Sequence, residues 1–115
     1  MRREIESYLE GFAPEGDTAE AGIAFDEGFS GFKGHFPEQP ILPGVCQIAL
    51  AMVMAERMRG TRQVLIEVVN AKFVSMVRPG QRLQVQCALA DGLLRAKLLS
   101  GETRVAEFKL RVEDA

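Results

Sequence analysis

Hydrophobic and polar residues alternate most regularly in the last part of the chain. Residues 106–113 place four apolar side chains on one face and charged side chains on the other, which is the period of two of a strand with one buried face. Residues 82–90 repeat this pattern, 93–99 form a second apolar stretch, and 64–77 are rich in β-branched residues. The Asp91-Gly92 pair between two of these segments is typical of a hairpin turn. We therefore predict about four antiparallel strands after residue 60.

Residues 45–58 have a different pattern, with apolar side chains on nearly every face of a helix. Only Gln47, Glu56 and Arg57 interrupt it. A helix that is apolar all round is enclosed by other elements, and Pro43 suits its start because proline lacks the N–H that would be unpaired there. The predicted fold is α+β, a curved antiparallel sheet wrapped around one buried helix. Pairing the sheet edges of two chains would remove exposed ladders, so we also expect a dimer.

The first 44 residues show weaker patterns. Residues 2–10 predict a short amphipathic helix, 11–16 a turn-rich break, and 21–29 a short strand. Residues 28–44 contain three prolines spaced three apart, which excludes both a helix and a central strand. We expect a loop there that holds functional groups in place.

Composition narrows the classes of function. The chain has 115 residues, which suits one domain over 1–115. It has 14 Lys and Arg against 16 Asp and Glu, which gives a net charge of −2. A global basic field for nucleic acid is absent, and no apolar run reaches the roughly 18 residues of a membrane span. The charged N-terminus does not resemble a signal peptide, so a cytoplasmic location is predicted. Cys46 and Cys87 have no metal-ligand spacing, so we expect no metal and no disulfide.

The loop and the start of the helix hold the candidate chemistry. His35 is the one histidine of the chain, and histidine is the side chain whose ordinary pKa lies near 6.5. Gly44 lies where a helix N-terminus offers unpaired N–H groups to a developing oxyanion. His35 could remove the proton next to a carbonyl that Gly44 polarises. The residues alone leave open that His35 is a packing or surface histidine and that Gly44 only lets the chain turn.

The segment from His35 to Gly44 carries the complete signature His-Phe-Pro-x-x-Pro-x-x-Pro-Gly. With Asn70-Ala71-Lys72-Phe73 and the turn at residues 77–83, it resembles the 3-hydroxyacyl-acyl-carrier-protein dehydratases of bacterial fatty acid synthesis. The resemblance covers residues 20–115 and implies a hotdog fold, a homodimer, an acyl-carrier-protein thioester as substrate and no cofactor. It assigns His35 as the base and Gly44 as the carbonyl-binding amide, with Phe36, Pro43 and Val45 beside the substrate.

The chain departs from this family at the acidic residue. The family has Glu or Asp fourteen positions after the histidine and often Gln four positions later, and these positions are Ala49 and Val53 here. Glu56 lies about 10 Å further along the helix, too far for a simple replacement. Glu38 is more often solvated, and Gln47 is more often a polar side chain at an exposed helix end.

Two hypotheses therefore stand. The first is a dehydratase-like lyase with an unidentified acid. The second is a non-catalytic module that binds acyl carrier protein or its thioesters, either alone or paired with a homologous subunit that supplies the carboxylate. A hotdog thioesterase is a weaker third hypothesis, since those enzymes usually use a carboxylate as base or nucleophile and the fixed positions of the motif contain none. Cys46 near the helix start is either a thiol of lowered pKa or, more simply, a buried packing residue.

A cluster of arginines after the buried helix is the predicted docking surface for an acidic carrier protein. Its members are Arg57, Arg59 and Arg62, with Lys33, Arg78 and Arg82 as further members if folding gathers them. The alternative is an ordinary solvated helix end, where cations also favour the helix dipole.

Overall fold

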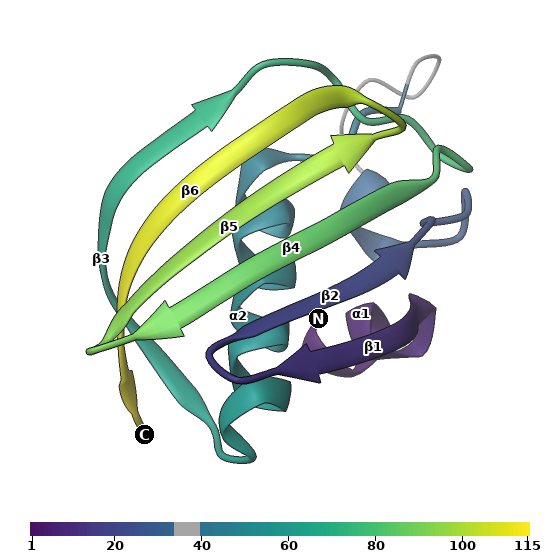
Figure 1. Ribbon diagram of the computed structural model, residues 1–115. Coiled ribbons are helices and arrows are strands. Elements are labelled where there is room, and N and C mark those ends of the chain that lie inside the picture. The colour runs from purple at the N-terminus through teal and green to yellow at the C-terminus, as the bar shows by residue number, and fades with distance from the viewer. Residues whose placement is uncertain (34–39) are drawn as a thin grey trace.

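One antiparallel sheet of six strands, in the order β1-β2-β4-β5-β6-β3, forms the body of the computed structural model, which describes residues 1–33 and 40–115 (Figure 1). The strands are β1 (Leu9–Glu15), β2 (Thr18–Ile23), β3 (Gln63–Phe73), β4 (Leu83–Ala90), β5 (Leu93–Ser100) and β6 (Thr103–Asp114). The helices are α1 (Arg2–Tyr8), the 3-10 turn η1 (Ser30–Phe32) and α2 (Gly44–Arg59).

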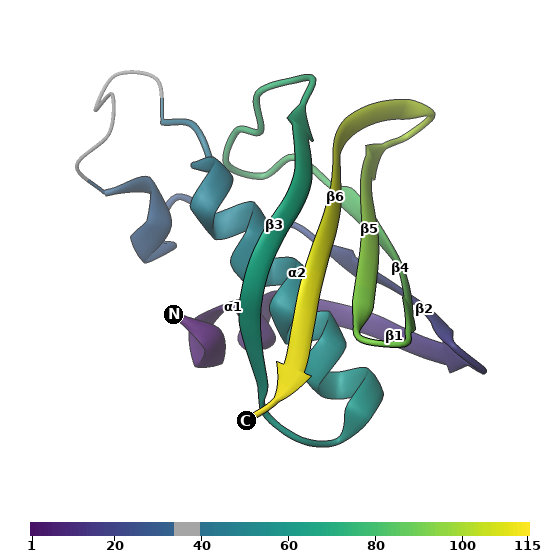
Figure 2. The ribbon, with the colours of Figure 1, turned by 90° about the vertical axis from the view of Figure 1, so that its left-hand side faces the viewer.

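The sheet curves around α2, as the side view shows (Figure 2). Leu50 and Met54 of α2 are fully buried, and alternate residues of the strands, such as Val85, Leu98 and Leu110, have no exposed surface either. The helix ends at Gly60, whose left-handed backbone (φ 71°) lets its N–H bond to the carbonyl of Glu56. The predicted curved sheet around one buried helix is confirmed.

The four strands predicted after residue 60 are also confirmed, with small shifts at their ends. Asp91 and Gly92 have φ values of 54° and 73°, both in the left-handed region that a two-residue hairpin turn requires. The turn joins β4 and β5 in the register that pairs Ala90 with Leu93.

The N-terminal prediction was wrong in two places. Most of the residues expected to form a break lie in β1, where Gly11 (φ 60°) permits an irregularity between Glu10 and Ala13 and pairing with β2 continues. The strand expected over 21–29 ends at Ile23. Phe25 lies beyond the end of this strand, and its ring stacks on the ring of Phe29 with the two centroids 4.4 Å apart.

Strand β3 lies at the sheet edge and is paired only with β6 among the described strands. Leu65, Val68 and Phe73 lie opposite core residues of β6, namely Val112, Leu110 and Ala106. Despite these buried partners, the three β3 side chains are 38–49% exposed. The packing of α2 against the sheet therefore leaves these three β3 side chains partly exposed.

Candidate functional site

The N-terminus of α2 provides two backbone donors. Pro43, with φ −63° and ψ 151°, precedes the helix, and its carbonyl accepts the N–H groups of Cys46 and Gln47. The N–H groups of Gly44 and Val45 come before these, and no described residue accepts a hydrogen bond from either. A helix N-terminus carries partial positive charge, so these two donors can bind and polarise a carbonyl oxygen.

Phe73 at the end of β3 packs directly against Gly44. A Cβ on Gly44 would lie 2.7 Å from Cζ of the Phe73 ring and 2.9 Å from Cε1. Close to this contact, the N–H of Leu42 donates to the carbonyl of Val77 at 2.8 Å. The segment before the helix is thus held beside the end of β3, and glycine is the residue that leaves space for the ring.

The surroundings of these donors are apolar and open. Val45 is 70% exposed, Phe73 49%, and Val74 and Met76 60% each, while Pro43 is half-buried. Exposed large apolar side chains gathered in one region are typical of a binding surface. In the sequence, Phe73 stood out only as part of a motif, and Val74 and Met76 were missed because no local pattern reveals their exposure.

The predicted residues His35 and Phe36 lie outside the described residues, as does Glu38. The structure places Pro43, Gly44 and Val45 together at the helix start. The assignment of His35 as the base stays a prediction.

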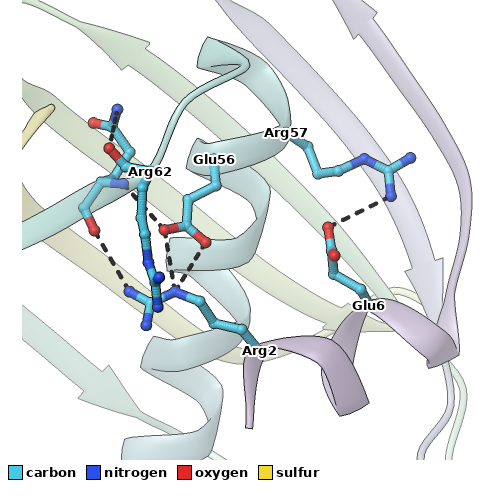
Figure 3. Close-up of polar contacts among 6 residues, drawn as sticks. Arg2, Glu6, Glu56, Arg57 and Arg62 are labelled. Carbon is cyan, nitrogen blue, oxygen red and sulfur yellow. Dashed lines mark hydrogen bonds and ion pairs between the residues drawn. The ribbon is translucent and has the colours of Figure 1, made fainter. Parts of the chain in front are cut away.

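The helix supplies no carboxylate near this end. Ala49 is half-buried, and Val53 is buried. The carboxylate of Glu56 accepts the Arg2 Nε–H at 2.9 Å and the backbone N–H of Gln63 at 3.0 Å (Figure 3). Glu56 therefore joins α1, α2 and β3, which is a structural role.

Gln47 is not at an exposed helix end, because only 3% of its surface is accessible. Its Nε2 donates to the carbonyl of Leu42 at 3.3 Å, and its Oε1 has no hydrogen-bond partner among the described residues. The side chain faces inward together with the buried Leu42 and Cys46.

Cys46 has the properties of a packing residue. Burial, and to a lesser extent the negative charge of Glu4, raise the pKa of its thiol above the ordinary value. Its Sγ lies 2.8 Å from where a Cβ on Gly31 would be. The alternative of a lowered thiol pKa at the helix start is therefore wrong.

The predicted arginine cluster lies at the other end of α2. Arg57 is thirteen residues after Gly44, about 20 Å along the helix axis. Its guanidinium lies 3.8 Å from the carboxylate of Glu6 (Figure 3). The same guanidinium lies 4.9 Å from the centroid of the Phe12 ring. Arg59 lies 3.7 Å from Asp114. The docking role of Arg57, Arg59 and Arg62 stays a prediction. The ion pairs of Arg57 and Arg59 reduce the positive charge that this cluster offers to an acidic partner.

Two further properties concern the described residues as a set. Residues 1–33 and 40–115 contain no group of three or more metal-ligating side chains. In the same ranges no helix has the length and apolar character needed to cross a membrane.

Comparison with known proteins connects this site to a family. The family model described as ApeI-like, ApeI dehydratase, matches residues 12–108. Proteins named 3-hydroxyacyl-[acyl-carrier-protein] dehydratase FabZ are similar as well. The one from Clostridium beijerinckii is 31% identical over 74 residues, 58% of this chain and 51% of the relative. The one from a Geobacillus strain is 33% identical over 82 residues, 65% of this chain and 52% of the relative. The chain thus spans about half the length of the curated relatives it matches.

Solved structures share the fold. The dehydratase heterocomplex ApeI:P from Xenorhabdus doucetiae contains a chain that superposes with a TM-score of 0.83 at 24% identity, covering 90% of this chain and 95% of that one. An uncharacterised protein from Erwinia carotovora gives a TM-score of 0.70 at 24% identity, covering 92% of each. These likenesses confirm the hotdog fold, and the matched residues 12–108 show that the chain belongs to the ApeI-like dehydratase family.

Proposed function

We propose that the chain takes part in dehydrating 3-hydroxyacyl thioesters of an acyl carrier protein, in fatty acid or related lipid or polyene biosynthesis in the cytoplasm. The main support is the pair of N–H groups at Gly44 and Val45, which have no acceptor among the described residues and lie in an exposed apolar surface. The names of the relatives support the substrate class. No cofactor is needed for this reaction.

In the proposed mechanism, His35 removes the proton on the carbon next to the thioester carbonyl. The electron pair of the broken C–H bond moves onto the carbonyl oxygen, which the Gly44 N–H stabilises. The electron pair then returns to form the carbon–carbon double bond, and the bond from C3 to its hydroxyl breaks. The hydroxyl needs a proton to leave as water, and this step calls for an acid.

A partner subunit would supply that acid, since Ala49 cannot. Two observations support a paired assembly. The uncovered apolar side chains of β3 offer a sheet edge and a face that a second subunit would bury. A protein of the same fold occurs in a dehydratase heterocomplex. A homodimer through β3 is the simpler assembly, but it carries Ala49 in both copies. A heterodimer with a homologous subunit is the assembly that would provide the carboxylate.

A non-catalytic module for acyl carrier protein or acyl thioesters is the second candidate. It is favoured by the same Ala49, because general acid assistance typically contributes about 10² to 10⁴-fold to a rate. Under this hypothesis, the helix start binds the thioester and no water is lost.

A turnover assay with a 3-hydroxyacyl-carrier-protein thioester separates the two candidates. The wild type paired with a homologous subunit that supplies the acid should form the enoyl product, and His35→Ala should lose this activity. Ala49→Glu should increase the activity of the chain on its own. Binding of the thioester without turnover, unchanged by Ala49→Glu in a folded variant, would support the module instead.

A further inference from the structure

The outer face of the sheet, which points away from α2, holds an unfavourable pair of like charges. Arg95 of β5 lies directly opposite Lys109 of β6 in the strand register. Like charges at directly opposed positions destabilise a sheet. Neither side chain, nor the neighbouring Lys72 of β3, forms an ion pair with a carboxylate in the part of the chain that the structure describes. A feature that lowers the stability of the fold, and that no other interaction compensates, is often part of a functional site.

The same face is hollowed around these cations. A groove of about 600 Å³ crosses it from β3 to β2, and Asn70, Lys72, Arg95, Lys97 and Lys109 contribute to its lining. The acidic residues on the lining are Glu20 and Glu107. Glu107 already lies 3.8 Å from Lys97 and 3.2 Å from Arg104. Positive charge is therefore left over along the β3, β6 and β5 side of the groove.

The distribution of charge along the chain strengthens this asymmetry. Residues 1–27 carry two arginines and eight acidic residues, a net charge of −6, whereas residues 28–115 carry a net charge of +4. Residues 1–27 include α1, β1 and β2, and β1 and β3 are the opposite edges of the sheet (Figure 1). An acidic partner is thus repelled by the β1 edge and attracted to the outer face near β3.

This cationic groove is also close to the candidate site. Lys72 directly precedes Phe73, whose ring packs against Gly44. The predicted arginine cluster, by contrast, begins about 20 Å along the helix from Gly44. A partner on the outer face beside Lys72 would have a short route around the end of β3 to the backbone donors. Because the face is perpendicular to the pairing edge, it stays accessible when β3 pairs with a second subunit.

We infer that the outer-face cationic groove, around Arg95, Lys109 and Lys72, is the docking surface for the acidic acyl carrier protein. This inference rests on the proposed function, since the carrier protein is its substrate carrier. The cations steer the carrier protein by long-range attraction, and contacts of this kind affect mainly the association rate and its salt dependence.

Charge reversal of single residues tests the docking surface by direct binding of an apo acyl carrier protein. Arg95→Glu should weaken binding at least about tenfold at low salt and reduce the salt dependence. The same substitution places opposite charges across β5 and β6, so Tm should be unchanged or raised. Arg3→Glu, on the exposed surface of α1, changes the net charge equally and is the matched control, with an expected loss of less than about twofold. Lys109→Glu is the second test of the groove.

A second measurement keeps docking apart from catalysis. The value of kcat/KM for a carrier-bound 3-hydroxyacyl thioester should fall in Arg95→Glu, while kcat/KM for the same acyl group on free pantetheine should not change. The inference is overturned if Arg95→Glu and Arg3→Glu weaken binding equally, if neither groove variant weakens binding, or if Arg59→Glu is the variant that abolishes it. If no variant turns over either thioester but Arg95→Glu still loses binding, the dehydratase proposal fails and the docking surface stands.

Discussion

Gly44 and Phe73 form the contact on which the candidate site most depends. Because a Cβ on Gly44 would lie 2.7 Å from the ring of Phe73, Gly44→Ala must displace either the ring or the helix start. Displacements of about 1 Å at a reacting group can cost roughly 10²-fold in rate. We expect the catalytic efficiency for the thioester to fall about 10 to 100-fold with the circular dichroism spectrum unchanged.

The double variant Gly44→Ala with Phe73→Ala is the control for this prediction. Removing the ring makes space for the new methyl group, so part of the lost activity should return. Gly44→Ala with wild-type kcat/KM would show that the close contact has no role in positioning the donors.

Cys87 gives a prediction about pH. Burial raises the pKa of its thiol from 9.0 to about 12. Between these values the unfolded thiol has lost its proton and the folded thiol keeps it, so the unfolded state binds fewer protons. The free energy of unfolding should therefore decrease as pH rises from about 9 to about 12, by at most about 1.4 kcal/mol per pH unit from this group.

Urea unfolding of the wild type and of Cys87→Ala across this pH range measures that contribution. The variant is less stable at neutral pH because it leaves a small cavity, but its stability should depend less steeply on pH in the alkaline range. Equal slopes for the two proteins would contradict the raised pKa.

At the residue scale, the sequence predicted the start of α2 but not its neighbours. Pro43 and Gly44 are a local signal for a helix N-terminus. The contact with Phe73 joins positions 29 apart in sequence, and the inward orientation of Gln47 depends on tertiary packing around Leu42. Neither leaves a pattern in a window of a few residues.

At the scale of elements, Glu56 joins three of them. Its carboxylate meets Arg2 of α1 and the first backbone N–H of β3. Because charged hydrogen bonds are lost and a partly buried donor is left without its acceptor, Glu56→Ala should lower the free energy of unfolding by about 1 to 3 kcal/mol.

The same variant tests whether Glu56 is the missing acid. A structural role predicts a turnover rate within about threefold of the wild type at a temperature well below the new Tm. Arg2→Ala should cause a smaller loss of stability, and the double variant should lose less than the sum, since the two residues interact. If Glu56→Ala alone, and not Arg2→Ala, slowed turnover by about a hundredfold or more, Glu56 would be the acid.

Helices and strands with a clear hydrophobic period in the sequence were predicted well, and those without such a period were not. The buried helix and the four later strands each carry an unambiguous pattern over seven or more residues. Strand β1 contains a glycine, a proline and two glutamates within Leu9–Glu15, so its sequence resembles a turn. It is a strand because β2 pairs with it, which is a non-local cause.

At the scale of the whole molecule, the uncovered face of β3 predicts association. Val68 is 44% exposed although it lies opposite the buried Leu110. Val68→Lys should place a charge in the proposed interface and shift the protein toward monomer in sedimentation velocity experiments. Thr103→Lys, at the exposed start of β6, is a matched control that should not change the sedimentation coefficient. A weak dimer of about −5 kcal/mol has a Kd on the order of 100 μM, so a wild type that stays monomeric at that concentration would contradict the homodimer.

The net charge of −2 gives little indication of the electrostatic character of the molecule. Composition excluded a global basic field, which is consistent with the structure, but it could not show where the charges lie. Acidic residues gather in the first 27 positions. Cations that have no ion pair within residues 1–33 and 40–115 gather on the outer face of β3, β5 and β6. Strand order brings those cations together, and strand order depends on long-range pairing that the sequence pattern does not contain.

The central claim is that His35 and the Gly44 N–H form the proton-abstracting half of a dehydratase site, with the acid missing at Ala49. Exchange of the proton next to the carbonyl of an acyl thioester in D₂O measures this half directly, because exchange needs the base and the donors but no departure of water. Mass spectrometry should show deuterium uptake with the wild type and a loss of about a hundredfold or more with His35→Ala. Ala49→Glu should add net dehydration to this exchange. Uptake at the buffer rate with the wild type, or equal uptake with His35→Ala, would contradict the account.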